Sequence, residues 1–363
     1  MVFHKCVCSY VPPYVIGSLA RRGSVTERGQ ARITAQQGKL SREVRRDKPV
    51  KMHEILASAG AASAGAARAG AASVTAAAAG SAGREVWDSA HTWDQRKTLV
   101  RAEGAAATPD PDVNLVYDSA GVVRKFYKEQ LDRNSIDNLG MNLVLNVHFG
   151  TNYMNAFWDG DEMTFGDGDG AIFTSFARSL DVIAHELAHG VTQFTANLDY
   201  NSQSGALNEH FSDVFGTAVT QFAENQEAGD ADWLIGNEIM GPTLFGESLR
   251  SMMAPGTAYD NTLMGKDPQP AHMSNYYAGP ADNQGVHINS GIPNRAFYLV
   301  ATDIGTPRAA AVWYHALQNL WATANFADAV DVIVASARVL TQSGKAPLGT
   351  TQSVRSAFRD VGL

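Results

Sequence analysis

The sequence has little cysteine and no long apolar run. Only two of its 363 residues are cysteines, Cys6 and Cys8, and both stand near the amino terminus. A disulfide framework is therefore excluded for the rest of the chain, which must be stabilised by core packing and, where present, by bound metal. No stretch of about 18 apolar residues occurs, so we predict no membrane span.

Positive charge is scarce outside the amino-terminal arm. Residues 1–50 contain ten Lys and Arg against three Asp and Glu, a net +7, which leaves −15 for the rest of a chain whose total is −8. An acidic body argues against nucleic acid as its main partner. The basic arm has the charge to bind nucleic acid, although docking on the acidic body is the simpler interpretation.

Composition divides the chain into three parts. Residues 1–50 are basic and polar with few periodic apolar positions, and 56–83 are a low-complexity tract of Ala, Gly and Ser. Such a tract buries little apolar area, so we expect a linker, with partial helix allowed by its alanines. The first residues do not form a good secretory signal, because Pro12 and Pro13 interrupt the apolar region and charges follow closely.

Hydrophobic periodicity predicts a β-rich half followed by a helical half. Within residues 84–180 we expect a helix at 113–131, a strand at 141–150 and two strands around an Asp-Gly turn at 155–170. Beyond them, helices are expected at 181–194, 206–223, 293–303, 308–323, 326–341 and 350–360. We therefore predict an α+β fold whose subdomains, 84–180 and 181–363, face each other across an active-site cleft.

Two histidines lie four residues apart in the apolar run VIAHELAHGVTQF. On a helix, His185 and His189 are one turn apart, about 6 Å along the axis, and can share one metal ion. A catalytic zinc ion takes three protein ligands and leaves one position for water, and Glu186 suits a general base beside that position. The alternative is a half-buried helix whose histidines are satisfied by ordinary hydrogen bonds.

The segment GALNEHFSDVFG offers a third ligand. Glu209 and Asp213 lie four residues apart on one face of a second apolar helix. Glu209 could complete a zinc site, and Asp213 could accept the remaining N–H of a ligand histidine. Taken alone, Glu209 is equally compatible with a solvated glutamate on a helix surface.

The order of these motifs resembles the thermolysin family of neutral zinc metallopeptidases. HELAH is followed after nineteen residues by Glu209, whereas related zinc aminopeptidases typically place eighteen residues in this gap. NAFWDG, LDYNSQSGALNE and DNQGVHINSGI resemble the family's substrate-edge strand, catalytic tyrosine segment and catalytic histidine loop. The matches run in order from about residue 84 to the carboxyl terminus.

The resemblance implies a zinc-dependent endopeptidase that cuts on the amino side of bulky hydrophobic residues. His185, His189 and Glu209 would bind one Zn²⁺ ion, and Glu186 would act as general base and proton shuttle. Tyr200 and His287 would donate hydrogen bonds to the oxyanion, and Asp282 would orient that histidine. Asn208 and Asp213 would support the zinc ligands. The substrate would be contacted by Asn155, Ala156, Leu249 and Arg250, and its pocket would be lined by Phe173, Phe176 and Val182.

The double calcium site of well-known family members is depleted in this chain. Asp181 and Asp232 remain, whereas Thr220 and Asn237 stand where acids are usual. Two carboxylates do not easily offset the dehydration of two close calcium ions. We therefore predict that this site is absent.

The amino terminus also departs from typical members. Only about 80 residues precede the body. The segment VPPYVIG, with Pro12, Pro13 and Tyr14, resembles the start of the short prosegments of protealysin-like members. In those members this start packs near the active-site cleft. We interpret residues 1–83 as an inhibitory prosegment and linker that the enzyme removes itself. A disordered interaction arm is the alternative.

The two cysteines allow a further inhibitory contact. A thiolate from Cys6 or Cys8 could occupy the open position of the zinc ion, although two incidental thiols are the simpler interpretation.

Two other functions compete with an endopeptidase. An aminopeptidase would need a motif that anchors the substrate's amino end, and we find none. A degenerate, purely binding relative should have lost Glu186 or a ligand, and all are present. We expect peptide and protein substrates and the chain's own prosegment as partners, a monomer, and a secreted protein, with a cytoplasmic location as the alternative.

Overall fold

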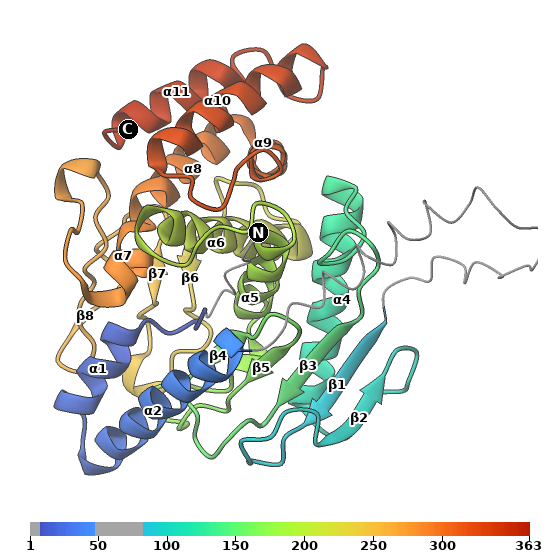
Figure 1. The fold of residues 1–363 in the computed structure, drawn as a ribbon, viewed down its shortest axis with the longest axis vertical. Helices are drawn as coiled ribbons and strands as arrows, with labels where there is room; N and C mark the ends of the chain where they lie inside the picture. Colours follow the sequence, from blue (N-terminus) through green and yellow to red (C-terminus); the bar gives the residue numbers. More distant parts are fainter. Residues whose placement is uncertain (1–7, 48–82) are drawn as a thin grey trace, which may run out of the picture.

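The computed structural model describes residues 8–47 and 83–363. Figure 1 shows a half that contains a sheet below a half built of helices, with two amino-terminal helices at the lower end. The α+β architecture predicted from the sequence is confirmed. Within the described ranges, no helix has the length and apolar character needed to cross a membrane.

The lower half is built around one five-stranded sheet. Its strands are β1 (Arg84–Asp88), β2 (Thr98–Ala102), β3 (Leu143–Val147), β4 (Ala156–Trp158) and β5 (Met163–Phe165). They stand in the order β2-β1-β3-β5-β4, with β1, β3 and β5 parallel and the two outer pairs antiparallel. β4 is therefore an outer strand, whose unpaired side can accept an added peptide segment.

Helix α4 (Pro111–Leu131) covers the sheet and contacts β1 and β3. It begins after Asp110, whose side chain accepts hydrogen bonds from the N–H groups of Asp112 and Val113. Pro111 takes the first helical position, where no N–H is needed. The helix predicted at 113–131 is thus confirmed, with its start two residues earlier.

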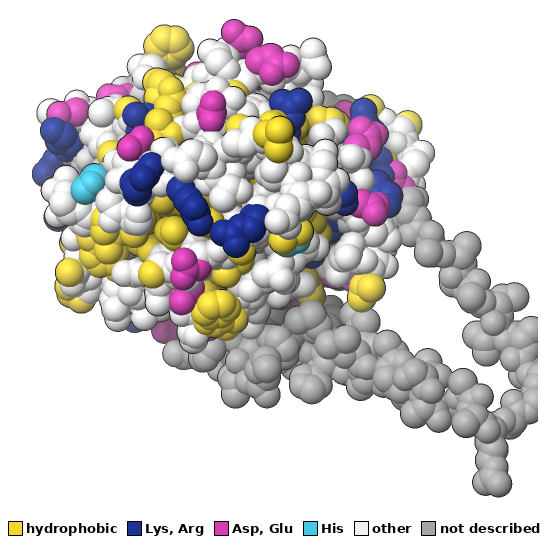
Figure 2. Space-filling view, turned by 90° about the horizontal axis from the view of Figure 1, so that it is seen from above, with side chains coloured by type: hydrophobic (Ala, Val, Ile, Leu, Met, Phe, Trp, Pro, Cys, Tyr) yellow, Lys and Arg dark blue, Asp and Glu magenta, His cyan; other side chains and the backbone are white. Residues whose placement is uncertain are grey.

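The upper half contains the helices that the apolar period predicts and one that it does not. The predicted helices are α5 (Leu180–Gln193), α6 (Ser202–Glu224), α8 (Gly291–Ile304), α9 (Thr306–Leu317), α10 (Phe326–Gln342) and α11 (Thr350–Asp360). The helix that was not predicted is α7 (Ala281–Asn289), in which residues 282–285 have left-handed backbone. Two short antiparallel pairs, β6 (Leu234–Ile235) with β7 (Arg250–Ser251) and β8 (Asp260–Asn261) with β9 (Gly265–Lys266), lie between α6 and α7 in the sequence. Seen from above, acidic, basic and apolar side chains are interspersed on the surface (Figure 2).

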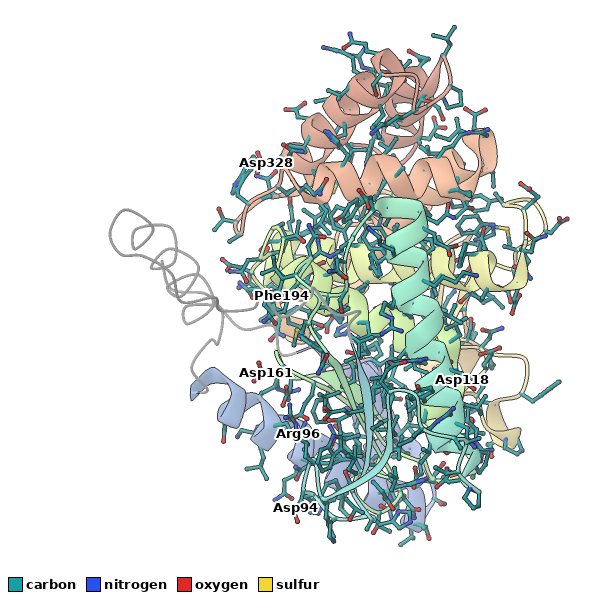
Figure 3. The ribbon with its side chains drawn as sticks, turned by 90° about the vertical axis from the view of Figure 1, so that its right-hand side faces the viewer. Asp94, Arg96, Asp118, Asp161, Phe194 and Asp328 are labelled. Atoms are coloured by element: carbon teal, nitrogen blue, oxygen red, sulfur yellow. The ribbon has the colours of Figure 1, made fainter. Side chains whose placement is uncertain are left out.

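Helix α5 lies at the junction of the two halves. Figure 3 shows Phe194, which follows α5, between the helical half marked by Asp328 and the sheet half marked by Asp161. Every residue from 181 to 193 is buried, so the polar side chains of this helix, His185, Glu186 and His189 among them, lie inside the molecule. Gly190 allows close packing, because a Cβ atom there would lie 2.6 Å from Ile136 and 3.1 Å from the Trp158 ring.

The amino-terminal arm folds into two helices that the sequence analysis did not predict. They are α1 (Pro13–Arg22) and α2 (Val25–Asp47). The Ser18 hydroxyl donates to the Leu263 carbonyl (2.7 Å), and the Met154 N–H donates to the Thr34 hydroxyl (3.2 Å). The alternative of a disordered arm is therefore wrong for the described residues 13–47, while the linker expected at 56–83 lies outside the described residues except for its last one.

Candidate active site

Three side chains from α5 and α6 converge on one point. The Nε2 atoms of His185 and His189 are 3.1 Å apart. Glu209 reaches both, with oxygens 3.5 Å from Nε2 of His185 and 3.4 Å from Nε2 of His189. Ligand atoms of a tetrahedral zinc ion with bonds of about 2.0–2.1 Å lie about 3.3 Å apart, so this spacing fits zinc.

The polar atoms of this cluster also fit a cation. Glu209 is completely buried, and among the described residues nothing donates a hydrogen bond to its Oε2. Burial lowers the pKa of His189 to about 3, which keeps its ring neutral, as a metal ligand must be. Burial also opposes charge on His185, but Asp213 and Glu209 outweigh it and raise the pKa of His185 to about 9. A bound cation would take the place of that proton.

Hydrogen bonds behind the histidines fix their orientation. Nδ1 of His185 lies 2.9 Å from Asp213, and Nδ1 of His189 lies 2.8 Å from the amide oxygen of Asn208. Asp213 also accepts two hydrogen bonds of 2.8 Å from Arg250. Burial alone would raise the pKa of Asp213, but the Arg250 charge and the His185 contact hold it well below its usual range. The sequence predicted the contact of Asp213 with a histidine but not its pairing with Arg250.

Glu186 lies beside the cluster and is fixed by the edge of the sheet. Its carboxylate is fully buried, and its Oε2 accepts a hydrogen bond of 2.8 Å from the Trp158 N–H at the end of β4. Glu186 follows His185 directly in α5, and its charge acts on Tyr200, whose hydroxyl donates to Glu209 of the cluster. This is the arrangement that a general base for a metal-activated water needs.

A second group of hydrogen-bond donors faces the same point. The Tyr200 hydroxyl donates to Glu209 and lies 3.2 Å from Nε2 of His287. On its other side, Nδ1 of His287 lies 2.6 Å from Asp282, which also accepts the backbone N–H of His287 at 2.8 Å. Burial opposes charge on His287, but Glu209 and Asp282 raise its pKa. A protonated His287 carries an N–H on both sides of its ring and can donate through Nε2.

A left-handed turn brings Asp282 back onto His287. The backbone at residues 282–285 has φ between 49° and 84°, and only the last of the four is glycine. Left-handed backbone costs roughly 1–2 kcal/mol for each non-glycine residue. Such strain is typical of functional sites, where the surrounding structure enforces it. In this chain it lets the Asp282 carboxylate cap two backbone N–H groups and orient the histidine.

The amino-terminal arm crosses the site as a peptide would. The Tyr10 N–H donates to the Ala156 carbonyl (3.0 Å). The side chain of Asn155 accepts from the Val11 N–H (2.8 Å) and donates to the Val11 carbonyl (3.2 Å). The Ser9 carbonyl lies 3.1 Å from Nε2 of His287. Residues 9–11 therefore extend along β4 with one carbonyl against a donor of the site.

Tyr10 fills a closed pocket below the histidines. Its side chain has no solvent exposure, and its ring contacts the edges of His185 and Phe176. The hydroxyl donates to Asp181 at 3.2 Å. The predicted pocket residues Leu249, Phe173 and Val182 belong to the same core as Tyr10. Sequence reasoning missed both Tyr10 and this role of Asp181, because no local pattern ties a residue of the arm to one in α5.

Arg250 is buried beside the same pocket. Its guanidinium carbon lies 5.5 Å from the centre of the Tyr10 ring. Two of its nitrogens donate to Asp213, and among the described residues no partner accepts from the third, NH1. A buried N–H group without an acceptor suits the contact with a substrate carbonyl that was predicted for Arg250.

The Pro-Pro-Tyr motif of the arm begins α1. Pro12 is buried, and its carbonyl accepts from the N–H groups of Val15 and Ile16 at the helix start. Pro13 takes the first helical position and is exposed, while Tyr14 is partly buried against the core. The motif thus turns the chain out of the cleft after Val11.

The region matched to the calcium site is a small acidic cavity of about 140 Å³. Asp181, Asp232, Thr220 and Asn237 line it, as do three acids that the sequence analysis did not consider, Glu224, Asp230 and Glu238. Asp232 accepts from the Asn237 amide, and the Thr220 hydroxyl donates to the Gly216 carbonyl. Burial and the nearby Asp181 charge raise the pKa of Glu238.

The fold and the site define a metallopeptidase in which two helices bring His185, His189 and Glu209 together at the junction of a sheet half and a helical half. The chain belongs to the thermolysin family of metallopeptidases. The catalytic domain of that family matches residues 57–193, and its alpha-helical domain matches residues 196–363.

Several relatives share a large part of this sequence. The chain is 42% identical to an extracellular metalloprotease of Pectobacterium carotovorum over 314 residues, which cover 86% of this chain and 84% of the relative. It is 46% identical to protease PrtS of Photorhabdus over 64% of each chain. It spans about half the length of thermolysin of Alicyclobacillus acidocaldarius, at 38% identity over 75% of this chain.

The structure is also similar to that of a protealysin precursor, a metalloproteinase of Serratia proteamaculans. The TM-score is 0.82 at 38% sequence identity, and the match covers 98% of this chain and 99% of the other. Because the match covers nearly the whole chain, it includes the amino-terminal arm as well as the two halves of the body.

Proposed function

We propose that this chain is a zinc-dependent endopeptidase that hydrolyses peptide bonds on the amino side of bulky hydrophobic residues. The observation that carries the proposal is the arm segment 9–11, which pairs with β4 and with Asn155 as an extended substrate would. In that register the Ser9–Tyr10 bond corresponds to the bond to be cut, and Tyr10 occupies the pocket for the residue that follows it.

His185, His189 and Glu209 would hold the zinc ion, which when bound polarises the substrate carbonyl and lowers the pKa of water. Glu186 would take a proton from the attacking water and deliver it to the leaving nitrogen, a role worth about 10²–10⁴-fold in rate. His287 and Tyr200 donate hydrogen bonds to the carbonyl oxygen as it gains charge, and one such donor typically contributes about 3 kcal/mol.

Positioning is the work of the remaining residues. Asn155 and the Ala156 carbonyl align the substrate backbone, as they do for Val11 and Tyr10. Arg250 has one buried N–H group left to bind a substrate carbonyl beyond the cut. Asp282 holds His287 in the orientation that exposes Nε2 to the substrate.

We also propose that residues 1–83 are a prosegment and linker, residues 84–180 the β-rich subdomain and 181–363 the helical subdomain of a zymogen. The arm blocks the cleft because it occupies the pocket and the edge strand together. We expect the mature enzyme to be a secreted monomer without the double calcium site of the family. A calcium titration that raises the melting temperature by many degrees would contradict this last point.

The experiment uses mature enzyme and peptides blocked at both ends that differ only in the residue after the central bond. We expect a peptide with tyrosine there to be cut internally at least tenfold faster than one with glycine, because only the former fills the pocket. Cleavage should stop with a zinc chelator and return with zinc.

The matched variants are Glu186→Gln and Glu129→Gln, the second an exposed residue of α4. Only the first should lose activity, by about 10²–10⁴-fold. Cleavage that survives zinc removal, or equal activity of the two variants, would refute an endopeptidase of this kind. Cleavage restricted to peptides with a free amino terminus would favour an aminopeptidase.

A further inference from the structure

Cys8 lies inside the proposed zinc site. Its side chain is buried, and its sulfur, a ring nitrogen of His189 and a carboxylate oxygen of Glu209 all lie within 4.8 Å of one another. The position is set by the backbone that follows, because Ser9 contacts His287 and Tyr10 pairs with β4. The protein itself therefore delivers the sulfur to the ligand cluster.

The oxidation state of the Cys8 sulfur can change. Cys8 is disulfide-bonded in the structure, and the sequence contains one other cysteine, Cys6, which lies outside the described residues. A thiolate is a strong zinc ligand, whereas a disulfide sulfur carries no charge and binds zinc poorly. Reduction of the disulfide would thus convert a neutral neighbour of the cluster into a ligand.

We propose that Cys8 is a redox latch: once reduced, it supplies the fourth ligand of the zinc ion and keeps the precursor inactive. This inference rests on the proposed function, because it concerns the regulation of the same site. A dithiol reductant gives two electrons and two protons to the disulfide and becomes a disulfide itself. The Cys8 thiol would then release its proton to solvent as its sulfur takes the position that water needs for hydrolysis.

The latch explains how a bond in the register of a substrate escapes hydrolysis. The Ser9–Tyr10 bond lies against His287 and the edge strand, so contacts to the substrate backbone are already in place. A thiolate at the fourth position removes the water that would attack this bond. Reducing compartments favour the thiolate and oxidising compartments the disulfide, so the latch holds inside a cell and opens outside it.

The test uses the full-length precursor with Glu186→Ala, which prevents self-cleavage, loaded with Co²⁺ in place of zinc. Cys6→Ser leaves Cys8 without the only other cysteine of the chain, and Cys8→Ser is the matched control. We expect a thiolate-to-cobalt charge-transfer band in the Cys6→Ser protein without any reductant. The Cys8→Ser protein should lack the band under all conditions. The parent should gain it only after treatment with a phosphine reductant, which brings no thiol of its own.

The visible ligand-field bands of cobalt distinguish a failure of the latch from a failure of the proposed metal site. If these bands appear in all three proteins but the charge-transfer band is missing from the Cys6→Ser protein, the latch is refuted and the metal site stands. If no protein binds cobalt, the proposed function fails with it. A second measurement follows self-cleavage of precursors in which Glu186 is intact. Under reducing conditions the Cys8→Ser precursor should be cleaved at least tenfold faster than the unmodified precursor. Equal rates would also refute the latch.

Discussion

At the scale of single residues, the site depends on buried partners as much as on the ligands. Asp213 has no solvent exposure and accepts hydrogen bonds from His185, Arg250 and Asn294. It therefore orients His185, a proposed metal ligand, and also pairs with Arg250, the cation proposed to bind substrate. Removing its charge should disturb both, although Asp213 itself touches neither metal nor substrate.

The first residue-scale prediction concerns Asp213→Asn. We expect the zinc affinity of the protein to fall about 10–100-fold, since the orienting partner of His185 loses its charge. Arg250 would be left as an unpaired buried cation, which should cost about 3–5 kcal/mol in the free energy of unfolding. Competition with a chromogenic chelator measures the affinity, and urea unfolding measures the stability. Asp94→Asn, at an exposed position between β1 and β2 (Figure 3), is the control that should change neither.

The sequence was sufficient for the residues whose spacing carries their chemistry. His185, Glu186 and His189 lie together on one helix turn, and Glu209 follows at a fixed distance on the next helix. Tyr10 could not be found in this way, because its place follows from the docking of the arm and not from its neighbours. Asp181 was considered only as a remaining acid of the calcium site predicted to be absent, because its contact with Tyr10 follows from the same docking.

At the scale of elements, a histidine clasp joins the sheet to its covering helix. His148, just beyond β3, lies 2.9 Å from Asp167 and 2.8 Å from Asp110, which precedes α4. The hydrogen bond with Asp167 has the largest effect on the protonation of His148 and favours the charged ring. Burial opposes the charge, and the contact with Asp110 favours it. Together they raise the pKa of His148 from 6.5 to about 9.

The element-scale prediction is that this clasp stabilises the fold in a pH-dependent manner. A raised pKa in the folded state means that the contribution is complete below pH 6.5 and is lost as the pH rises through about 9. His148→Gln should therefore lower the free energy of unfolding by about 2 kcal/mol at pH 6 and by little above pH 10. Urea unfolding at both pH values measures it, and a deficit of equal size at both would refute the clasp.

Elements with a clear apolar period were predictable, and elements governed by other forces were not. Helix α5 was predicted within about a residue of its observed bounds. Helix α9 was predicted to end near residue 323 but ends at Leu317. Just beyond this end, the Asn319 side chain donates to the His315 carbonyl and so competes with the helical backbone. Helix α2 was missed because it is polar overall and has few apolar positions, and no sequence pattern indicates the left-handed turn at 282–285.

At the scale of the whole molecule, the amino-terminal arm holds the two halves in one arrangement. Residues 9–11 contact β4 of the sheet half and His287 of the helical half in a single pass. Helix α1 then reaches the loop at Leu263, and α2 supports the segment before β4 through Thr34. A basic arm on an acidic body adds attraction of the right sign, although salt screens much of it.

The central claim is that a zinc-dependent peptidase is held inactive by its own amino-terminal arm. The most direct measurement is made without reductant and follows the mass of the purified full-length protein, and its cleavage of a blocked peptide, over several hours. It compares the unmodified protein with Glu186→Ala, each with and without a zinc chelator. We predict that the unmodified protein loses about 80 residues and gains activity, and that chelation or the substitution stops both changes. An unmodified protein that binds zinc yet stays whole and inactive would contradict the account.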